Sequence, residues 1–444
     1  MVDMQILKIV NYKNISKWNV PDLIHKNLSG KYENLSLYNF LERDKTVVNI
    51  QDDILYKQIT VHQYGEGVSL RCEKKGKEIG TKRQFLAKKG QLIVSGIDAR
   101  NGSVGLITDY LDGGIVTNDF WLFNLKNVDS KFMQLLLSLE KTSNYMQSKS
   151  NGTTNRQRVN IQDFLQIKMP VPSLEEQKTI IKKYGDAIAE AEKLEKNADE
   201  EISSIEKYIH DVTCIPIIND EIESKLLSFS KFSDLSEKWT ITPLMSEINQ
   251  KLSFSKYPLY SVSRCLNCVT RSWKKSSEKN ETFQYIEIGG IDIENETISS
   301  STVEVKKAPS RATQIVKTGD LIFGLTRPYL KKFAIIDESH NDNVCSSGFQ
   351  VIKPSDNYRL EYILEIFKSN ICVSQFKEAM TGALYPALNA DQLGSIRIPL
   401  PPLSVQEEIV SHINEIKANV KSLRKQAADL RTKAKQDFEN AVFN

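Results

Sequence analysis

Lys168-Met-Pro-Val-Pro-Ser-Leu-Glu-Glu-Gln177 is the stretch that decides the fold, because a second version of it, Arg397-Ile-Pro-Leu-Pro-Pro-Leu-Ser-Val-Gln406, follows 229 residues later. The same offset relates Asn160 to Asn389. A period this long that occurs only twice is not typical of a solenoid, whose repeats are short and numerous. The pattern instead indicates that one unit, a globular domain followed by a long helix, has been duplicated.

Length and composition are those of a soluble globular protein. The chain has 444 residues, of which 40% are hydrophobic and 26% charged, so two or three domains can each bury a core. The net charge of +3 does not identify a partner. However, residues 1–172 are net basic and residues 173–212 net acidic, which permits nucleic-acid binding by the first globular part.

The cysteines and the apolar segments predict a cytoplasmic protein. The chain has six cysteines and begins without a cationic and then apolar signal region, so we expect reduced thiols. Only Cys265 and Cys268 have ligand-like spacing; without a second Cys/His pair, structural zinc is the weaker interpretation. No apolar run approaches the roughly 18 residues of a membrane-spanning helix.

The duplication predicts an α/β protein with two mixed α/β domains in tandem, separated by two long helices. We expect the first domain over 1–172, with a lead-in over 1–30, and the first helix over 173–212. The second domain is expected over 213–402, with a linker over 213–238, and the second helix over 403–444. Short β-rich runs bounded by glycines predict the strands. Helical spacing predicts one helix over 129–146 and one or two over 358–380.

Both long helices carry a heptad-like apolar stripe, which neither can bury alone. At a rise of 1.5 Å per residue, each would be roughly 60 Å long. An antiparallel pair within one chain is the preferred interpretation, and a parallel coiled coil between two copies is the alternative. Ser173 with Glu176 and Ser404 with Glu407 have capping-box spacing at the two helix starts. The stripes are Ile180, Tyr184, Ala187, Ala191, Leu194, Ala198, Ile202, Ile205 and Ile209, and Ile409, Ile413, Ile416, Val420, Leu423, Ala427, Leu430, Ala434 and Phe438.

Two similar domains held apart by stiff helices suit the reading of two separated stretches of DNA, whose faces recur about every 34–36 Å. Base-reading side chains in loops, with Lys and Arg nearby for phosphates, are then expected. In the first domain the candidates are Lys82, Arg83, Arg100, Asn155, Arg156, Gln157 and Arg158. In the second they are Arg271, Lys274, Lys275, Arg311, Arg327, Lys331, Lys332 and Tyr385.

The doubled motif resembles that of the specificity subunit of type I restriction–modification systems. The match lies in a Pro-x-Pro-x-Leu-x-x-Gln segment that continues as a long helix, at Pro170, Pro172, Leu174 and Gln177, and again at Pro399, Pro401, Leu403 and Gln406. Gly90-Gln-Leu-Ile93 and Gly319-Asp-Leu-Ile322 resemble the family's "Gly-Asp-Leu-Leu" run, although Gln91 departs from the expected Asp.

The resemblance implies that each globular domain is a target recognition domain for one half of a bipartite double-stranded DNA site. It also implies that the helices fix the gap and dock two modification (methyltransferase) subunits, with restriction (motor-nuclease) subunits added. S-adenosylmethionine, ATP and Mg²⁺ would belong to those partners, so no cofactor is expected in this chain.

The alternatives are a stand-alone or decoy DNA-binding protein, a nuclease or methyltransferase in its own right, and a coiled-coil scaffold. A phosphate-binding Gly-x-x-x-x-Gly-Lys-[Ser/Thr] motif and an Asn-Pro-Pro-[Tyr/Phe] methyltransferase motif are both absent from the sequence. Glu73-Lys-Lys75 has the spacing of a nuclease half-site, but a charged turn explains it better. The five histidines are isolated, so no catalytic triad can be assembled.

Overall fold

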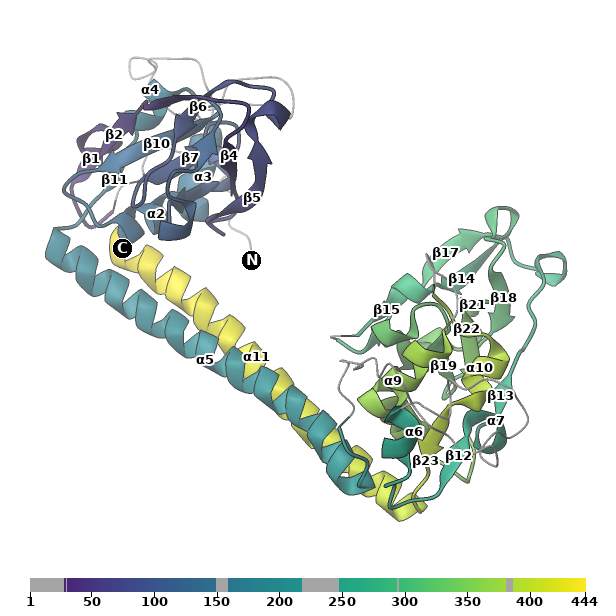
Figure 1. The fold of residues 1–444 in the computed structure, drawn as a ribbon. Coiled ribbons are helices and arrows are strands. Elements are labelled where there is room, and N and C mark those ends of the chain that lie inside the picture. Colours follow the sequence, from purple (N-terminus) through teal and green to yellow (C-terminus); the bar gives the residue numbers. More distant parts are fainter. Residues whose placement is uncertain (1–27, 29, 149–158, 218–246, 294, 381–385) are drawn as a thin grey trace, which may run out of the picture. The chain divides into compact units, whose positions relative to one another are not determined.

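The computed structural model describes residues 28, 30–148, 159–217, 247–293, 295–380 and 386–444 (Figure 1). The chain divides into two compact units. Unit 1 comprises Met1–Leu194 with Lys425–Asn444, and unit 2 comprises Glu195–Arg424. Nearly all of the predicted lead-in, residues 1–30, and most of the predicted linker, residues 213–238, lie outside the described residues.

The described residues of unit 1 form two large sheets and a small one. Their strand orders are β2-β10-β7-β8, β3-β6-β9-β4-β5 and β1-β11. The strands are β1 Asn34–Ser36, β2 Leu41–Asp44, β3 Val47–Asn49, β4 Leu55–Val61, β5 Val68–Lys75, β6 Arg83–Leu86, β7 Leu92–Ser95, β8 Val104–Leu106, β9 Ile115–Val116, β10 Phe120–Leu125 and β11 Lys168–Pro170. The helices are α2 Ser130–Ser138, α3 Glu140–Ser148 and α4 Ile161–Leu165.

The four-stranded sheet of unit 1 is buried on both faces, because successive side chains of its strands enter two different clusters. Leu92 and Val94 of β7 pack with the helices α2, α3 and α4, whereas Ile93 packs with Phe85 of the five-stranded sheet. Unit 1 is therefore layered as sheet, sheet and helices. The sequence predicted the inner sheet and the helices that cover it, but it did not predict the outer sheet as a separate layer.

Unit 2 repeats this plan, but among its described residues the outer sheet has four strands in place of five, and a further two-stranded sheet is added. Its strand orders are β13-β22-β19-β20, β17-β14-β21-β18, β12-β23 and β15-β16. The strands are β12 Leu259–Ser261, β13 Cys268–Val269, β14 Thr282–Ile286, β15 Ile291–Asp292, β16 Thr297–Ile298, β17 Ser301–Glu304, β18 Ala312–Ile315, β19 Leu321–Gly324, β20 Phe333–Ile335, β21 Val344–Ser346, β22 Phe349–Ile352 and β23 Arg397–Pro399. The helices are α6 Glu247–Leu252, α7 Val262–Cys265, α8 Leu360–Lys368, α9 Asn370–Ala379 and α10 Ala390–Ser395.

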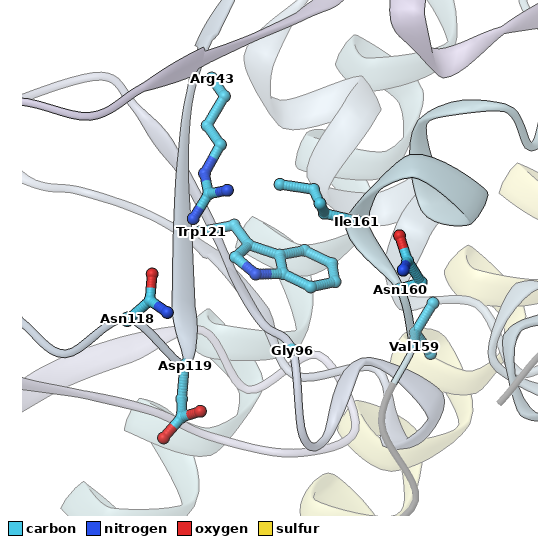
Figure 2. A pocket seen from close by; sticks show the side chains of 8 residues that line it. All are labelled: Arg43, Gly96, Asn118, Asp119, Trp121, Val159, Asn160 and Ile161. Carbon is cyan, nitrogen blue, oxygen red and sulfur yellow. The ribbon is translucent and has the colours of Figure 1, made fainter. Parts of the chain in front are cut away.

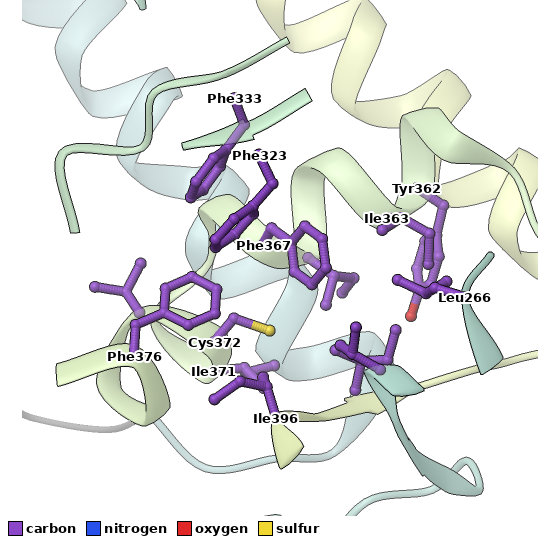
Figure 3. Close-up of a cluster of buried hydrophobic side chains, with 14 of the residues drawn as sticks. Leu266, Phe323, Phe333, Tyr362, Ile363, Phe367, Ile371, Cys372, Phe376 and Ile396 are labelled. Carbon is purple, nitrogen blue, oxygen red and sulfur yellow. The ribbon is translucent and has the colours of Figure 1, made fainter. Parts of the chain in front are cut away.

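An aromatic cluster holds the helices of unit 2 on its central sheet (Figure 3). Phe323 of β19 and Phe333 of β20 stack with ring centroids 4.2 Å apart, and Phe367 of α8 and Phe376 of α9 meet Phe323 edge-on. These rings are almost completely buried. Offset-stacked and edge-on pairs of this kind add about 1 kcal/mol each beyond the burial of their area.

The helices that cover the sheets differ from the prediction in one respect. The stretch 129–146 forms two helices in place of one, because the backbone of Leu139 is extended between α2 and α3. In unit 2 the stretch 358–380 divides at Ser369 in the same way, which confirms the two-helix option. Helical spacing of side chains does not show the break, since the break changes only one residue's backbone angles.

The two long helices are α5 Leu174–Thr213 and α11 Leu403–Phe443, and both continue across the division between the units. In unit 2 they run antiparallel: Asn419 donates to Glu201 at 2.7 Å, and the rings of Tyr208 and His412 lie 4.2 Å apart. In unit 1 Tyr184 of α5 meets Phe438 of α11. The antiparallel prediction is confirmed. The stripe of α11 is buried or half-buried throughout, but Ile202 of α5 is 39% exposed, so the prediction was wrong there.

The helix starts are capped differently in the two copies. Ser173 and Glu176 form the predicted capping box, with Ser173 Oγ 2.8 Å from the Glu176 carboxylate. The equivalent prediction for Ser404 and Glu407 is wrong. Pro402 occupies the position that corresponds to Ser173, Ser404 lies inside α11, and Glu407 instead pairs with Arg359.

Two buried glutamines make the same pair of hydrogen bonds, one in each unit, and we call each pair a glutamine clamp. In unit 1 the Gln177 amide donates to the Pro172 carbonyl at 2.8 Å and accepts from the Asp129 N–H at 2.7 Å. In unit 2 the Gln406 amide donates to the Pro401 carbonyl and accepts from the Arg359 N–H, both at 2.8 Å. Asp129 and Arg359 directly precede α2 and α8. Each clamp therefore joins the start of a long helix to the helices that cover the sheet.

Replacing a clamp glutamine should destabilise its own unit. Gln177→Ala and Gln406→Ala each leave a backbone N–H and a carbonyl without a partner, so we expect each to lower the free energy of unfolding by about 2 kcal/mol. Gln166→Ala, at an exposed position, is the matched control and should change it by less than about 0.5 kcal/mol. Urea unfolding measures all three variants. If the clamp variants were as stable as the control, the clamp would not hold the helix.

The Gly90 and Gly319 turns precede the central strands β7 and β19, and both glycines have a left-handed backbone, at φ 80° and 82°. In each turn the second residue accepts a hydrogen bond from a backbone N–H three residues earlier: Gln91 from Lys88, and Asp320 from Lys317. Asp320 then forms an ion pair with Arg271. Gln91 instead donates to the carboxylate of Asp44 at 2.8 Å. The acid therefore lies on the turn in unit 2 and on the edge strand in unit 1, which explains the departure at Gln91.

The different position of the acid in the two units predicts how the Gly90 turn responds to an added acid. Burial opposes ionisation of Asp44, but hydrogen bonds from Lys88, Thr46 and Gln91 outweigh it and hold the pKa of Asp44 well below its usual value. Gln91→Asp brings a second carboxylate to Asp44, so we expect about 1 kcal/mol of destabilisation at pH 7.

The sign of the pH dependence is fixed by the charges. Two facing carboxylates raise each other's pKa, so the cost of Gln91→Asp should shrink as the pH falls through about 4. Adding Asp44→Asn to the same chain removes the repulsion and should restore stability at pH 7. Thermal unfolding of the single and double variants at both pH values measures this. If the single and double variants were equally stable at pH 7, the expected repulsion between the added carboxylate and Asp44 would be contradicted.

Candidate nucleic-acid interface

In each unit the segment that follows the central strand, β7 or β19, contacts the segment that follows the predicted Gly-bearing recognition loop. We call this contact region the loop edge. In unit 1 it comprises residues 96–103 and 159–160; in unit 2 it comprises residues 325–332 and 386–388. Gly96 accepts a hydrogen bond from the Val159 N–H at 3.4 Å, and Leu325 accepts one from the Leu388 N–H at 3.0 Å. The two contacts are related by the 229-residue offset. Each recognition loop predicted from the sequence therefore leads directly into a loop edge.

Two basic residues of the loop edge in unit 2 have a left-handed backbone. Arg327 has φ 50° and Lys331 has φ 54°, and they flank a 3-10 helix over Pro328–Leu330. The equivalent of Lys331 in unit 1 is Gly102, at φ 66°. A side chain in this region costs about 1–2 kcal/mol relative to its ordinary conformation, and such strain clusters at functional sites. The fold tolerates a lysine where its other copy has glycine, which favours a functional use for that charge.

Several of the predicted basic residues, Lys82, Arg271, Lys275 and Lys332 among them, have partners within their own unit. Lys82 pairs with Asp52 at 2.6 Å and donates to the Gly76 carbonyl at 2.8 Å. Arg271 donates from both terminal guanidinium nitrogens to the carboxylate of Asp320, which is almost completely buried. Lys275 donates to the Lys306 carbonyl and Lys332 to the Ile291 carbonyl. Asp320 directly precedes β19, so its ion pair with Arg271 lies at the opposite end of that strand from the loop edge.

The other predicted residues fall into three groups. Arg83, Lys274 and Arg311 are exposed, and the Arg311 carbonyl accepts from the Ser347 N–H beside the loop edge of unit 2. Arg100, like Arg327 and Lys331, lies on a loop edge, in the 3-10 helix Ala99–Asn101. Asn155, Arg156, Gln157, Arg158 and Tyr385 lie outside the described residues. DNA contact by any residue of the set stays a prediction.

A cavity that the sequence did not predict opens beside the loop edge of unit 1 (Figure 2). Its volume is about 360 Å³. The lining residues are Arg43, Gly96, Asn118, Asp119, Trp121, Val159, Asn160 and Ile161. Arg43 belongs to β2, an edge strand whose Leu-Glu-Arg-Asp sequence carries little β signal, and Trp121 belongs to β10. The pairing of Arg43 with Phe123 brings the two strands together, and no local pattern reveals that register.

The described residues contain no group of three or more His, Cys, Asp or Glu side chains that could hold a metal ion. Glu73, Lys74 and Lys75 lie exposed on the strand β5, so their prediction as a charged turn was wrong. Burial raises the pKa of Cys265 to about 11. None of the described helices has the length and apolar character needed to cross a membrane.

Residues 30–204 and 263–430 match the family model described as "Type I restriction modification DNA specificity domain". The chain belongs to this family. Two relatives of this specificity-domain chain are the type I restriction enzyme MjaVIII specificity subunit of Methanocaldococcus jannaschii and the HindI specificity subunit of Haemophilus influenzae. The first is 20% identical over 450 residues, covering 100% of this chain and 97% of the relative. The second is 25% identical over 166 residues, which cover 36% of this chain and 35% of that relative.

The specificity-domain chain also resembles a solved structure described as "Structural basis underlying complex assembly and conformational transition of the type I R-M system". The match has a TM-score of 0.58 and 12% identity, and it covers 93% of this chain and 98% of the other. At this identity the likeness shows the fold alone. It confirms the tandem arrangement of two sheet-rich domains with long helices.

The strained lysine of the specificity domain in unit 2 gives a test of the loop edge. Lys331→Gly removes a charge and places glycine where its counterpart Gly102 already is, so we expect stability to be unchanged or raised by up to about 1 kcal/mol. DNA affinity should nevertheless fall, with a salt dependence reduced by about one phosphate contact. Lys353→Gly, which removes an exposed charge at the end of β22, away from the loop edge, is the comparison. If Lys331→Gly lost stability and kept its affinity for DNA, the left-handed lysine would have a structural role only.

Proposed function

We propose that this chain is the DNA sequence-recognition subunit of a type I restriction–modification complex. Each unit reads one half of a bipartite double-stranded DNA site. The observation that carries the proposal is the duplication of a whole set of contacts. The proline segment, the clamp glutamine and the hydrogen bond of the loop edge recur in both units at the 229-residue offset, and the N–H that each clamp glutamine accepts from directly precedes the equivalent helix. Membership of the specificity-domain family supports the same assignment.

The loops that lead into each loop edge make the contacts with the bases. Residues 155–158 offer Arg, Gln and Asn side chains, which make paired hydrogen bonds to guanine and adenine edges in the major groove. Arg100, Arg311, Arg327 and Lys331 supply positive charge for the phosphates alongside. Arg271 is assigned a structural role, because its guanidinium is occupied by the buried Asp320.

The chain recognises DNA sequence and does not itself catalyse a reaction. It has no nucleotide-binding or methyltransferase motif in its sequence. Catalysis and cofactors are assigned to the partners: two methyltransferase subunits that use S-adenosylmethionine, and restriction subunits that use ATP and Mg²⁺. The helices α5 and α11 dock these partners in the cytoplasm and fix the gap between the half-sites. Base flipping and methyl transfer then take place in the methyltransferase subunits.

Mapping adenine methylation in host cells with and without this gene tests the proposal. We expect methylation at one bipartite DNA sequence to disappear when the gene is deleted and to return when the gene is restored. The purified chain, supplied with Mg²⁺ alone or S-adenosylmethionine alone, should leave DNA unaltered. An unchanged methylation map would instead favour a stand-alone or decoy DNA-binding protein, and alteration of DNA by the chain alone would make it an enzyme.

A further inference from the structure

Arg43 is a half-buried cation without an acidic partner among the described residues. Its guanidinium makes no hydrogen bond or ion pair within the part of the chain that the structure describes, and burial lowers its pKa. An isolated charge withdrawn from water is costly unless a group of opposite charge or several acceptors compensate it. The compensating group is therefore expected to come from a ligand that enters the cavity.

The cavity around Arg43 offers further hydrogen-bond donors. The five-membered ring of the Trp121 indole lies on the side of the cavity that holds Arg43 and Asn118, and its N–H has no partner among the described residues (Figure 2). The Asn118 side chain is exposed at the rim and likewise makes no hydrogen bond that the described residues could supply. Asn160 uses its oxygen to cap α4, which leaves its amide N–H groups for other partners.

The one carboxylate of the cavity is turned away from these donors. Figure 2 shows the side chain of Asp119 directed away from the guanidinium of Arg43, and the two do not form an ion pair. Donors without a facing acid favour an acceptor-rich, negatively charged ligand. A phosphodiester group meets both requirements, since it supplies a full negative charge and two non-bridging oxygens to a guanidinium fork.

We propose that this cavity binds one phosphodiester group of the DNA half-site read by unit 1, with Arg43, Trp121 and Asn118 as donors. This inference rests on the function proposed above. The cavity adjoins the loop edge, so the phosphate bound there fixes the register of unit 1 on the duplex while the loop reads bases.

The equivalent positions of unit 2 do not carry the arginine and the tryptophan of this donor set. Arg43 pairs across the sheet with Phe123, and the equivalent pair in unit 2 joins Cys268 to Ile352. The 229-residue offset replaces Trp121 by Gln350, whose amide donates to backbone carbonyls. The phosphate contact is therefore specific to one half-site, although the two units share their fold.

A charge-neutral phosphate scan tests the inference. The complete complex with its methyltransferase subunits is titrated with synthetic duplexes that carry the mapped DNA site and a single methylphosphonate at each position in turn. We expect one position in the half-site of unit 1 to weaken wild-type binding by about tenfold at low salt. In Arg43→Gln the affinity for unmodified DNA should already be lower by a similar factor, and methylphosphonate at that position should cost nothing more.

Three further measurements complete the test. The slope of log K against log salt should fall by about 0.9 in Arg43→Gln. Trp121→Phe should show a smaller loss at the same phosphate. Arg71→Gln, with the same charge change at an exposed site of unit 1, should keep the wild-type methylphosphonate profile. Thermal unfolding checks that each variant is folded.

The outcomes separate the two proposals. If the wild-type complex binds no specific DNA, the proposed function fails. If it does, and Arg43→Gln keeps both the wild-type affinity and the wild-type phosphate profile, the cavity is not a phosphate site. If Arg43→Gln relaxes the sequence requirement at one base pair and leaves the phosphate profile unchanged, Arg43 reads a base, and the inference is likewise overturned.

Discussion

The contact on which the architecture depends is the hydrogen bonding of one buried glutamine in each unit. Gln177 and Gln406 each join a proline segment to the start of the helices that cover a sheet. The start of one long helix is thereby fixed to each unit. The same unit also buries the end of the other long helix: Phe438 in the core of unit 1, and Ile209 in the core of unit 2. Because a helix start and a helix end share each core, the two helices have to be antiparallel.

The sequence predicted these helices because their signals are local. Prolines that end the strand, a polar helix start and a stripe of apolar residues lie within a few turns of one another. The clamp itself could not be predicted, since the backbone N–H groups that Gln177 and Gln406 accept from lie 48 and 47 residues earlier. Ser404 misled the prediction for a related reason. Its spacing to Glu407 imitates a capping box, whereas the repeat register places Pro402 at that position.

The residues that bind DNA are harder to predict from the sequence than the fold, because a basic side chain has the same local sequence signal whether it binds DNA or a neighbouring acid. Lys82 and Arg271 were chosen for their charge, and the structure gives both of them partners within their own unit. Arg43 was missed for the opposite reason. It lies in a short edge strand without β-branched residues, and its importance depends on Trp121 and Asn118, which are far away in the sequence.

Duplication also explains why the two units can differ at positions where they would touch DNA. The glutamine clamps and central strands have to keep their geometry, because each holds a helix and a core in place. The loop edges and the edge strands β2 and β13 carry no such requirement, so Gly102 can be Lys331 and the Arg43 position can be Cys268 without loss of the fold. Where the same backbone position holds glycine in one unit and a left-handed lysine in the other, stability favours the glycine. The charge at Lys331 is therefore better explained by what unit 2 binds than by how unit 2 folds.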